Sequence, residues 1–438
     1  MERSTNAAVR LPSVARAQAV ARSPRRLAVR GAALRLAPLL PLYLAVTAIA
    51  QPWGHLAGDE HDFLTYAQRI LHGAYADPHT MNPNLFLWHG PGTPFLLAPF
   101  VALDVPLEAM RFLMAPLLFG AVLVFHRLLR VRLGPRASLA GAYAFGLYLP
   151  FLQPLRSVHK EPLAILLVSA GLLGLSGYLA RGGRRYLALG GISLAGLVMV
   201  RLEYGWVMIA LLLVCGGWWA VRRSWSPPRR AAAVAALAVA GCVPWLAYTY
   251  SLTHKPLYWG NSGGSSLYWM SPTGPGETGQ WHADHTVFQN ARFARYRPFI
   301  GHVKSLPPFA RNAAMEKAAT ANVRAHPAQY ARNLAANAAR LWFLVPFWPR
   351  QPWGTLALYW VFNGLLIAAS GWAAATLVRN RRRLAPETFP IAAFAVIGLL
   401  VHLFPSADPR MVLPIVPALV WLIAHAAALR SDTREVHP

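Results

Sequence analysis

Carboxylate and cationic side chains gather at a few points of this sequence, and their types and spacing suit chemistry on a phosphate-linked substrate. The chain has 16 Asp and Glu residues among 438, against 42 Lys and Arg residues. Three groups stand where long apolar stretches begin or end: Asp59 and Glu60; Arg156, His159, Lys160 and Glu161; and Asp408 with Arg410. If these stretch ends meet in the fold, a carboxylate and several cations surround one cavity at the membrane–water boundary.

Such a combination of groups predicts one class of reaction. A carboxylate can accept the proton of a hydroxyl group as its oxygen attacks, while fixed cations hold a phosphate leaving group. Arginine presents a planar fork that binds two phosphate oxygens at once. The headgroup of a lipid phosphate lies at the depth where these apolar stretches end, so a lipid-linked substrate fits this arrangement.

Each of these residues also has a purely structural interpretation. Asp59 can cap the helix that follows it, because Asp is favoured at that position and acids are favoured in the first turn. Glu161 can pair with a neighbouring cation, and Arg201 can form a local ion pair with Glu203 in a short turn. Three cations can simply reach from helix ends into water: Arg156, Lys160 and Arg410.

Histidine is unevenly distributed, which raises the question of a metal site. Most of the 15 histidines fall in the segments assigned below to the outer face. A metal site built from His61, His89 or the His282-x-Asp284-His285 triplet is conceivable, because imidazole and carboxylate are common ligands. None of these matches a spacing as specific as HExxH. We therefore expect no metal and no cofactor, and histidines that form ordinary hydrogen bonds.

Long apolar segments dominate the rest of the chain, which is 55% hydrophobic and 13% charged with a mean hydropathy of +0.35. They have the length, roughly 16–25 residues, that a helix needs to cross about 30 Å of hydrocarbon. We predict an all-α fold, a polytopic transmembrane helical bundle of about ten spans. The predicted spans are 33–52, 108–129, 137–153, 160–179, 186–201, 204–221, 231–249, 354–378, 387–404 and 411–429.

The formal net charge of +26 is concentrated in short arginine clusters between apolar segments. The clusters lie at 130–136, 181–185, 222–230 and 379–383. Such clusters mark cytoplasmic loops, so both termini are predicted inside and residues 53–107 and 250–353 outside. Residues 1–32 and 430–438 are then cytoplasmic tails that flank the membrane domain 33–429. This pattern favours membrane lipids as partners and excludes nucleic acid.

The two outer loops are predicted to contain helices of their own. Apolar residues recur at helical spacing over 63–71, which predicts an amphipathic juxtamembrane helix on the membrane surface. The apolar stretch 93–103 is too short to cross and is predicted to be re-entrant or interfacial. The Gly- and Ser-rich stretch 260–279 predicts irregular structure. Helix is predicted from about Phe309, with a break at Pro327.

Four motifs follow one another along residues 35–429. They are Asp59-Glu60 with Tyr66, Ala67 and Gly73; His89-Gly90-Pro91-Gly92 with Pro94 and Leu96; Ser157-Val158-His159-Lys160-Glu161-Pro162; and Asp408-Pro409-Arg410-Met411. Together they resemble the GT-C integral-membrane glycosyltransferases. The most similar branch contains protein O-mannosyltransferases and lipid A aminoarabinose transferases (glycosyltransferase family 39). Gly90 and Met411 depart from that pattern, which has a proline and an aromatic residue there.

The resemblance implies an inverting transfer of a sugar from a polyprenyl-phosphate donor to a hydroxyl acceptor on lipid or polysaccharide. In the catalytic pair Asp59-Glu60, Asp59 would be the base that activates the acceptor, and Glu161 would support the site. The remaining candidates would bind the lipid phosphate or the substrate: Arg156, His159, Lys160, Arg201, Arg410 and His89. The active site would face the periplasmic or extracytoplasmic side of the cell (plasma or inner) membrane.

Two other functions remain open. A non-enzymatic transporter or flippase of a lipid-linked sugar is expected to place ionisable groups near mid-membrane on broken helices. An assembly subunit that kept the fold without activity would tolerate Asp59→Asn. The transferase hypothesis requires the Asp59 carboxylate to lie within about 10 Å, roughly one Debye length, of arginines from the other outer helix tips.

Overall fold

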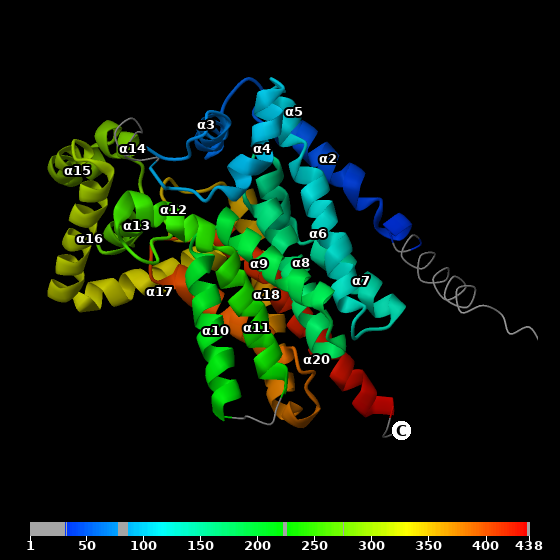
Figure 1. Ribbon diagram of the computed structural model, residues 1–438. Helices are drawn as coiled ribbons and strands as arrows, with labels where there is room; N and C mark the ends of the chain where they lie inside the picture. The colour runs from blue at the N-terminus through cyan, green and yellow to red at the C-terminus, as the bar shows by residue number, and fades with distance from the viewer. Residues whose placement is uncertain (1–30, 32, 78–85, 222–225, 275, 436–438) are drawn as a thin grey trace, which may run out of the picture.

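Every secondary-structure element in the part of the chain that the structure describes is a helix, which confirms the predicted all-α fold (Figure 1). The described residues of this computed structural model are 31, 33–77, 86–221, 226–274 and 276–435. Nearly all of the predicted tail 1–32, and the end of the predicted tail 430–438, fall outside them.

Long helices form a bundle, and shorter helices form an outer layer at one end of it (Figure 1). The bundle consists of α2 (Leu39–Ala50), α5 (Leu107–Arg111), α6 (Met114–Leu129), α7 (Pro135–Gly146), η1 (Leu149–Leu155), α8 (Glu161–Arg181), α9 (Arg184–Val200), α10 (Tyr204–Val221), α11 (Ser226–Gly241), α12 (Val243–Thr253), α18 (Trp353–Arg379), η3 (Arg381–Arg383), α19 (Thr388–Leu403), η4 (Pro409–Ile415) and α20 (Val416–Glu435). The outer layer consists of α3 (Glu60–Leu71), α4 (Gly92–Ala102), α13 (Gly263–Met270), α14 (Asp284–Gln289), η2 (Ala291–Tyr296), α15 (Arg297–Lys304), α16 (Pro308–Ala325) and α17 (Pro327–Phe343).

Six helices of the described residues are long and apolar enough to cross a membrane, so the protein is a multi-pass membrane protein. They are Ala33–Ala50, Leu107–Leu129, Glu161–Arg181, Tyr204–Val221, Trp353–Arg379 and Pro409–Arg430. The bent pair of α11 and α12, with 44° between its halves, makes a seventh if it is one span.

The predicted count of about ten is not confirmed. α7, α9 and α19 occupy the other predicted spans but have only 12, 17 and 16 residues. At 1.5 Å per residue, a helix of 12 residues covers only about 18 Å.

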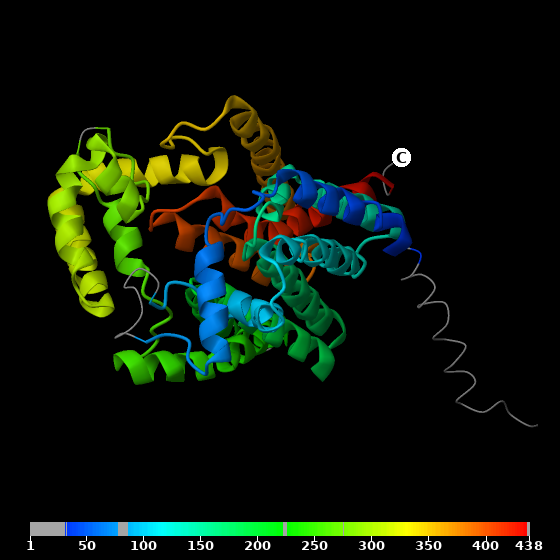
Figure 2. The ribbon, with the colours of Figure 1, turned by 90° about the horizontal axis from the view of Figure 1, so that it is seen from above.

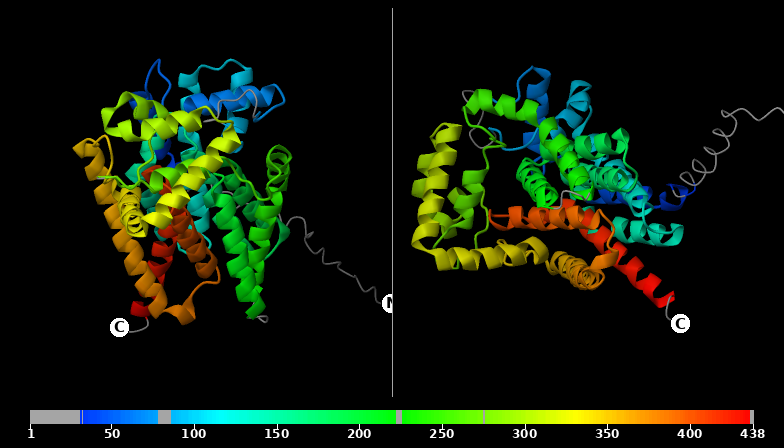
Figure 3. Two further views of the ribbon diagram at one scale, coloured as in Figure 1. Left: turned by 90° about the vertical axis from the view of Figure 1, so that its left-hand side faces the viewer. Right: turned by 60° about the horizontal axis from the view of Figure 1, so that its bottom comes forward.

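The arginine-rich turns and the outer layer lie at opposite ends of the bundle. The turns that follow α6, α8 and α18 lie at the lower end in Figure 1, whereas α3 and α4 lie at the upper end. The turn after α18 is also seen at the lower end in the left view of Figure 3. This is the separation that the positive-inside pattern predicts. α4 is an apolar helix of eleven residues, which matches the prediction of a short helix over 93–103 that does not cross the membrane.

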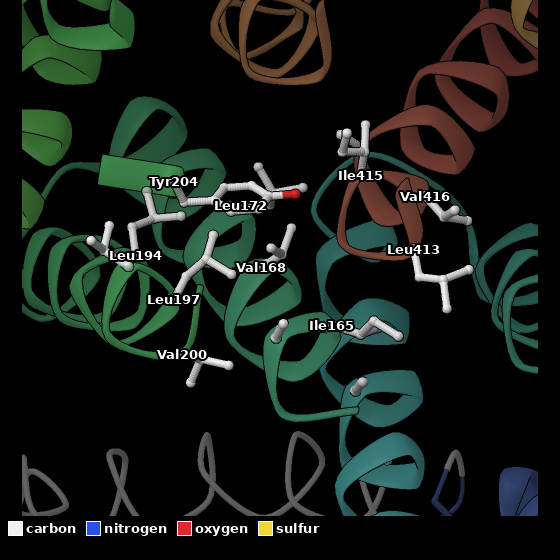
Figure 4. Packing of buried hydrophobic residues seen from close by; sticks show 14 of the residues in the cluster. Ile165, Val168, Leu172, Leu194, Leu197, Val200, Tyr204, Leu413, Ile415 and Val416 are labelled. Atoms are coloured by element: carbon white, nitrogen blue, oxygen red, sulfur yellow. The ribbon is translucent and has the colours of Figure 1, made fainter. Parts of the chain in front are cut away.

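The helices α8 and α9 pack so closely that their backbones touch. A Cβ atom added to Gly174 of α8 would lie 2.2 Å from the backbone nitrogen of Gly190 on α9. Small residues at such a crossing let membrane helices approach and gain van der Waals contact. Next to this crossing, Val168 and Leu194 are buried in the main core (Figure 4). The crossing fixes the outer ends of α8 and α9 relative to each other.

The predicted amphipathic helix is present as α3, but protein rather than lipid headgroups covers its apolar face. Phe63 and Tyr66 are buried. The ring of Tyr66 stacks on Tyr75 with 4.5 Å between centroids, and its hydroxyl oxygen accepts a hydrogen bond from the backbone N–H of Trp88 at 3.1 Å. The ring of Phe63 lies 4.9 Å from that of His89. α3 is therefore part of the folded outer layer, because Tyr75, Trp88 and His89 pack against it.

The second outer loop is more helical at its start than its composition predicts. α13 forms within the stretch 260–279 because it docks on α16: a Cβ atom on Gly264 would lie 2.2 Å from the carbonyl oxygen of Asn312. The Asn312 side chain also accepts a hydrogen bond from the backbone N–H of Gly264 at 2.8 Å. Tertiary packing thus overrides weak helix propensity. α16 and α17 confirm the predicted break at Pro327, and α13 and α16 belong to the lobe on the left of Figure 2.

The contact of α8 with α9 predicts that Gly174→Ala lowers the thermal midpoint of unfolding, because overpacking of this kind costs about 1–3 kcal/mol. The matched control is Gly371→Ala on α18, where the added Cβ atom meets nothing within 4 Å. There alanine stabilises a helix by up to about 1 kcal/mol relative to glycine. Thermal unfolding of both purified variants in lipid nanodiscs measures the difference, and equal midpoints would contradict the packing argument.

Candidate functional site

A buried ion pair fixes the N-terminal end of α3. Glu60 and Arg111 are fully buried and share two contacts, from Nε to Oε1 at 2.8 Å and from Nη2 to Oε2 at 2.7 Å. The backbone N–H groups of Ala57 and Val158 donate to the same carboxylate, each at 2.7 Å. Glu60, a predicted catalytic residue, is thus saturated by the protein itself. Its contacts tie α3 to α5 and to the segment before α8, and thereby position the neighbouring Asp59.

Asp59 stands at the N-cap of α3, but its carboxylate makes no capping hydrogen bond. Its Oδ2 instead accepts a hydrogen bond from Nη1 of Arg410 at 2.8 Å, which joins residues 351 positions apart. The two side chains are 21% and 22% exposed, so the pair is partly open. The distance meets the condition of about 10 Å that the transferase hypothesis requires.

The short helix η4 presents Arg410 at the entrance to the last span. The Oδ1 atom of Asp408 caps η4 by accepting a hydrogen bond from the backbone N–H of Arg410 at 3.1 Å. The same oxygen lies 3.9 Å from the Nε atom of Arg410. Pro409 and Pro414 restrict the backbone on either side. The cap and the two prolines thus hold the guanidinium beside Asp59.

The surroundings of Asp59 keep it ionised. Burial by itself would raise the pKa of this carboxyl, but the positive charges of Arg410, His89 and Lys160 outweigh that effect and hold the pKa well below its usual range. The hydrogen bond from Arg410 acts in the same direction. Asp59 is therefore a carboxylate throughout the physiological pH range, and it is a weak base while Arg410 remains paired with it.

Further ion pairs lie behind the first. Glu161, the first residue of α8, is fully buried and lies 3.1 Å from Nη2 of Arg201 at the end of α9. Nη1 of Arg201 lies 3.3 Å from Glu203, whose carboxylate lies 3.5 Å from Nε2 of His402 on α19. Burial by itself would raise the pKa of Glu203, but the charge of Arg201 lowers it below its usual range. This chain of contacts connects the outer ends of α8, α9 and α19.

His159 connects the two sets of ion pairs. Its Nδ1 atom lies 3.4 Å from Nη1 of Arg410 and 3.5 Å from Oε2 of Glu161. Burial lowers the pKa of His159 even though the charge of Glu161 opposes this. The ring is therefore neutral near pH 7, and its Nδ1 accepts a hydrogen bond from Arg410.

Lys160 is available for an anion. Within the described part of the chain its ammonium group makes no hydrogen bond or ion pair, although Asp59 and Glu203 line the same cavity. Burial and the charge of Arg201 lower the pKa of Lys160. A bound anion such as phosphate would offset both effects.

A cavity of about 670 Å³ opens beside Asp59, a size typical of a small-molecule site. Its charged lining residues are Asp59, Lys160, Glu203, Asp408 and Arg410. We call the part of the lining formed by residues within 259–286 and 347–349 the outer-loop wall. It is rich in aromatic residues: Trp259, Trp281, Phe347 and Trp348.

Not every predicted residue reaches this cavity. Arg156 is exposed, its Nε atom lies 3.5 Å from the carbonyl oxygen of Ala50, and it does not line the cavity. Glu161 and Arg201 lie behind the lining rather than on it. His89 lines the cavity, and its Nε2 atom lies 3.1 Å from Asp62.

Steric crowding explains why glycine rather than proline stands at position 90. A Cβ atom on Gly90 would lie 2.1 Å from the carbonyl oxygen of Met199, and one on Gly92 would lie 2.6 Å from Cγ2 of Val200. Glycine permits this close approach of one backbone to another. The His89–Gly92 loop therefore rests directly on the end of α9, where a proline at position 90 would not fit.

Sequence patterns did not indicate Arg340, Gln280 or Trp348, which shape the outer-loop wall. Arg340 of α17 is fully buried and donates hydrogen bonds to uncharged acceptors, including the carbonyl oxygens of Gly279 and Ala407. The backbone N–H of Trp348 donates to Oε1 of Gln280 at 2.7 Å. These residues are scattered along the second outer loop, and no local spacing connects them.

The described residues contain no group of three or more His, Cys, Asp or Glu side chains placed to hold a metal ion. His282 of the candidate triplet packs instead between the rings of Trp269 and Phe293, with centroids 5.1 and 4.3 Å away. Asp284 pairs with Arg311 at 3.0 Å. Burial and nearby arginines lower the pKa of His282 to about 4, so its ring is neutral at physiological pH.

These features define a multi-pass membrane protein with a partly open site of paired charges at one end of its bundle. No protein-family model matches the sequence, and no curated protein matches it.

Two solved structures of an oligosaccharyltransferase from Archaeoglobus fulgidus are similar to the chain. One, tethered with an acceptor peptide containing the NVT sequon, has a TM-score of 0.47 and 13% identity over 92% of this chain and 50% of that chain. The other, in complex with an inhibitory peptide and a dolichol-phosphate, has a TM-score of 0.45 and 14% identity over 92% of this chain and 51% of that chain. The chain thus spans about half the length of these structures. Likeness at this level establishes neither a family nor an activity for the chain.

The saturated pair of Glu60 and Arg111 predicts a structural phenotype for Glu60→Gln. The substitution leaves the buried charge of Arg111 uncompensated, which costs about 3–5 kcal/mol, so the thermal midpoint of unfolding should fall steeply. Combining it with Arg111→Met should restore part of the loss. The control is Glu316→Gln at an exposed position of α16. A Glu60→Gln protein as stable as the control but unable to act on its substrate would instead assign Glu60 to catalysis.

Proposed function

We propose that the chain is an inverting glycosyltransferase. It moves a sugar from a polyprenyl-phosphate donor to a hydroxyl group of a lipid or polysaccharide at the outer face of the membrane. The prenyl chain of the donor lies among the membrane helices, and its phosphate and sugar enter the cavity beside Asp59. The order of the four motifs that resemble GT-C enzymes supports the same proposal.

The pairing of Asp59 with Arg410 is the observation that carries the proposal. A carboxylate and a guanidinium from opposite ends of the chain lie 2.8 Å apart beside a cavity. One is the base that the reaction needs, and the other is a cation with the geometry to bind phosphate. Lys160 adds a second positive charge on the same cavity.

The proposed reaction is a single displacement. The acceptor oxygen attacks the anomeric carbon from the side opposite the phosphate, which inverts the configuration. The bond from that carbon to the phosphate oxygen breaks, and the polyprenyl phosphate leaves with the electron pair. Asp59 takes the hydroxyl proton, while Arg410 and Lys160 stabilise the charge on the departing phosphate.

The donor phosphate also changes how basic Asp59 is. In the free protein, Arg410 contributes to the low pKa of Asp59. A phosphate that binds Arg410 offsets part of its positive charge, so the pKa of Asp59 rises towards the range of an effective base. Binding of the donor therefore prepares the carboxylate for the acceptor.

Asp59→Asn is the central test, because it keeps the shape of the side chain and removes the base. Loss of general-base catalysis is expected to slow transfer by about 10²–10⁴-fold. Cells that lack the gene are complemented with wild-type or variant protein, and their lipids and glycans are compared by mass spectrometry. The variant should fail to restore the missing sugar, whereas Asp104→Asn, at an exposed loop position, should restore it.

The same comparison distinguishes the other functions. A flippase that has lost activity would leave its lipid-linked substrate on the wrong face of the membrane with normal glycan chemistry. An assembly subunit without activity would be fully replaced by the Asp59→Asn protein. Either result would overturn the transferase proposal.

Arg410→Gln is expected to shift the acidic limb of the pH profile of kcat/KM, where activity falls as the pH decreases, to higher pH. Removal of the positive charge raises the pKa of Asp59, so the carboxylate is lost by protonation at a higher pH than in the wild type. The acidic limb of kcat/KM, which reports the free enzyme, should therefore shift upward, on top of an overall loss from weaker phosphate binding. Transfer measured from pH 3 to pH 8, roughly the range in which carboxyl groups and histidines titrate, tests this. An unshifted limb would show that Arg410 does not tune Asp59.

A further inference from the structure

The outer-loop wall carries no formal charge, unlike the rest of the cavity. Among the described residues, it contributes Trp259, Gly260, Ser262, Gly263, Ser266, Gln280, Trp281, His282, Ala283, His285, Thr286, Phe347, Trp348 and Pro349. None of these is Asp, Glu, Lys or Arg. A ligand group that meets this wall therefore finds hydroxyls, an amide, imidazoles and aromatic rings.

The acids nearest to this wall in the sequence are already engaged. Glu277 pairs with Arg295, and Asp284 pairs with Arg311. Neither acid lines the cavity. His282 is neutral at physiological pH because burial lowers its pKa to about 4. An ammonium group on a ligand would thus lose its hydration here without gaining an acidic partner, which is costly.

Two tryptophans from different outer loops meet at the cavity. The ring centroids of Trp88 and Trp281 lie 6.5 Å apart with 52° between the planes, and Trp281 is 42% exposed. An indole face left open to water gains free energy when an apolar surface covers it. Ser262 and Thr286 place hydroxyl groups on the same wall. Flat apolar surface beside neutral hydrogen-bonding groups matches a sugar ring, which has C–H faces and a hydroxyl edge.

We infer that the outer-loop wall binds an uncharged pyranose ring, stacked on Trp281, and discriminates against amino sugars. The inference rests on the proposed function and narrows its substrate class. The sugar belongs either to the donor or to a saccharide acceptor, and the chemistry of recognition is the same for both.

The test uses the full chain in lipid nanodiscs and saturation-transfer NMR. The probes are methyl glucoside, methyl mannoside and methyl galactoside, with methyl glucosaminide as the matched charged sugar. At least one neutral glycoside should receive saturation at its ring protons, and the charged sugar should receive less. Trp281→Ala should reduce the signal about threefold to tenfold, the range expected for one aromatic contact. Trp281→Phe should retain most of it.

Trp353→Ala is the matched control, because Trp353 is 65% exposed and does not line the cavity. It should leave the saturation signal unchanged. The inference is overturned if the charged glycoside receives as much saturation as the neutral ones, or if Trp281→Ala behaves like Trp353→Ala. The absence of saturation for every neutral glycoside would overturn it as well.

A second arm identifies the source of the sugar. The NMR experiment is repeated after loading the nanodiscs with undecaprenyl phosphate carrying a neutral sugar. Loss of the glycoside signal assigns the wall to the donor sugar, and a retained signal assigns it to the acceptor; both outcomes support the inference.

Binding of undecaprenyl phosphate alone, measured for wild type and Arg410→Gln, tests the proposed function separately. If the lipid phosphate binds through Arg410 but no glycoside contacts Trp281, only the inference about the wall fails.

Discussion

The site depends on keeping one carboxylate and one guanidinium together at one end of the bundle. Ionised groups are costly to remove from water, so a pair such as Asp59 and Arg410 persists only where each partner is held in place. Asp59 is held through its neighbour Glu60, which is saturated by Arg111 and two backbone N–H groups. Arg410 is held by the cap of η4. The remaining helices bring Asp59 and Arg410 within hydrogen-bonding distance of each other.

The cavity is lined by charged residues from helix ends and by an uncharged wall, and this division gives the site its chemistry. The charged side can stabilise a phosphate and receive a proton, whereas the outer-loop wall can recognise a ring by shape and hydrogen bonding. The two sides come from different parts of the chain, since helix ends supply the charges and the second outer loop supplies the wall. Substrate choice can therefore change through the loop while the helix ends stay constant.

Much of this could be predicted from the sequence, because it depends on local signals. The lengths of the apolar stretches predicted the long helices. The charged residues at the ends of those stretches predicted that Asp59 and Arg410 lie close together. The exact span count could not be predicted, since α9 and α19 match the predicted segments but, at 17 and 16 residues, lie at the lower limit of length for a span. α7 ends at Gly146, seven residues before the end of the predicted segment 137–153. The resemblance pairs Glu60 with Asp59 in catalysis, but the contacts that saturate Glu60 could not be predicted, because Arg111 and Val158 lie 51 and 98 positions away. Successive helical residues point about 100° apart, so neighbours can have different surroundings. The outer-loop wall depends on contacts between distant segments, which no local pattern encodes.

The buried guanidinium of Arg340 has a mechanical consequence for the whole cavity. It donates to the carbonyl oxygen of Gly279, immediately before the wall residues Gln280 and Trp281, and to that of Ala407, just ahead of η4. One rigid planar group thus links the outer-loop wall to the segment that carries Arg410. Displacing either segment is therefore expected to strain the hydrogen bonds that Arg340 donates to the other.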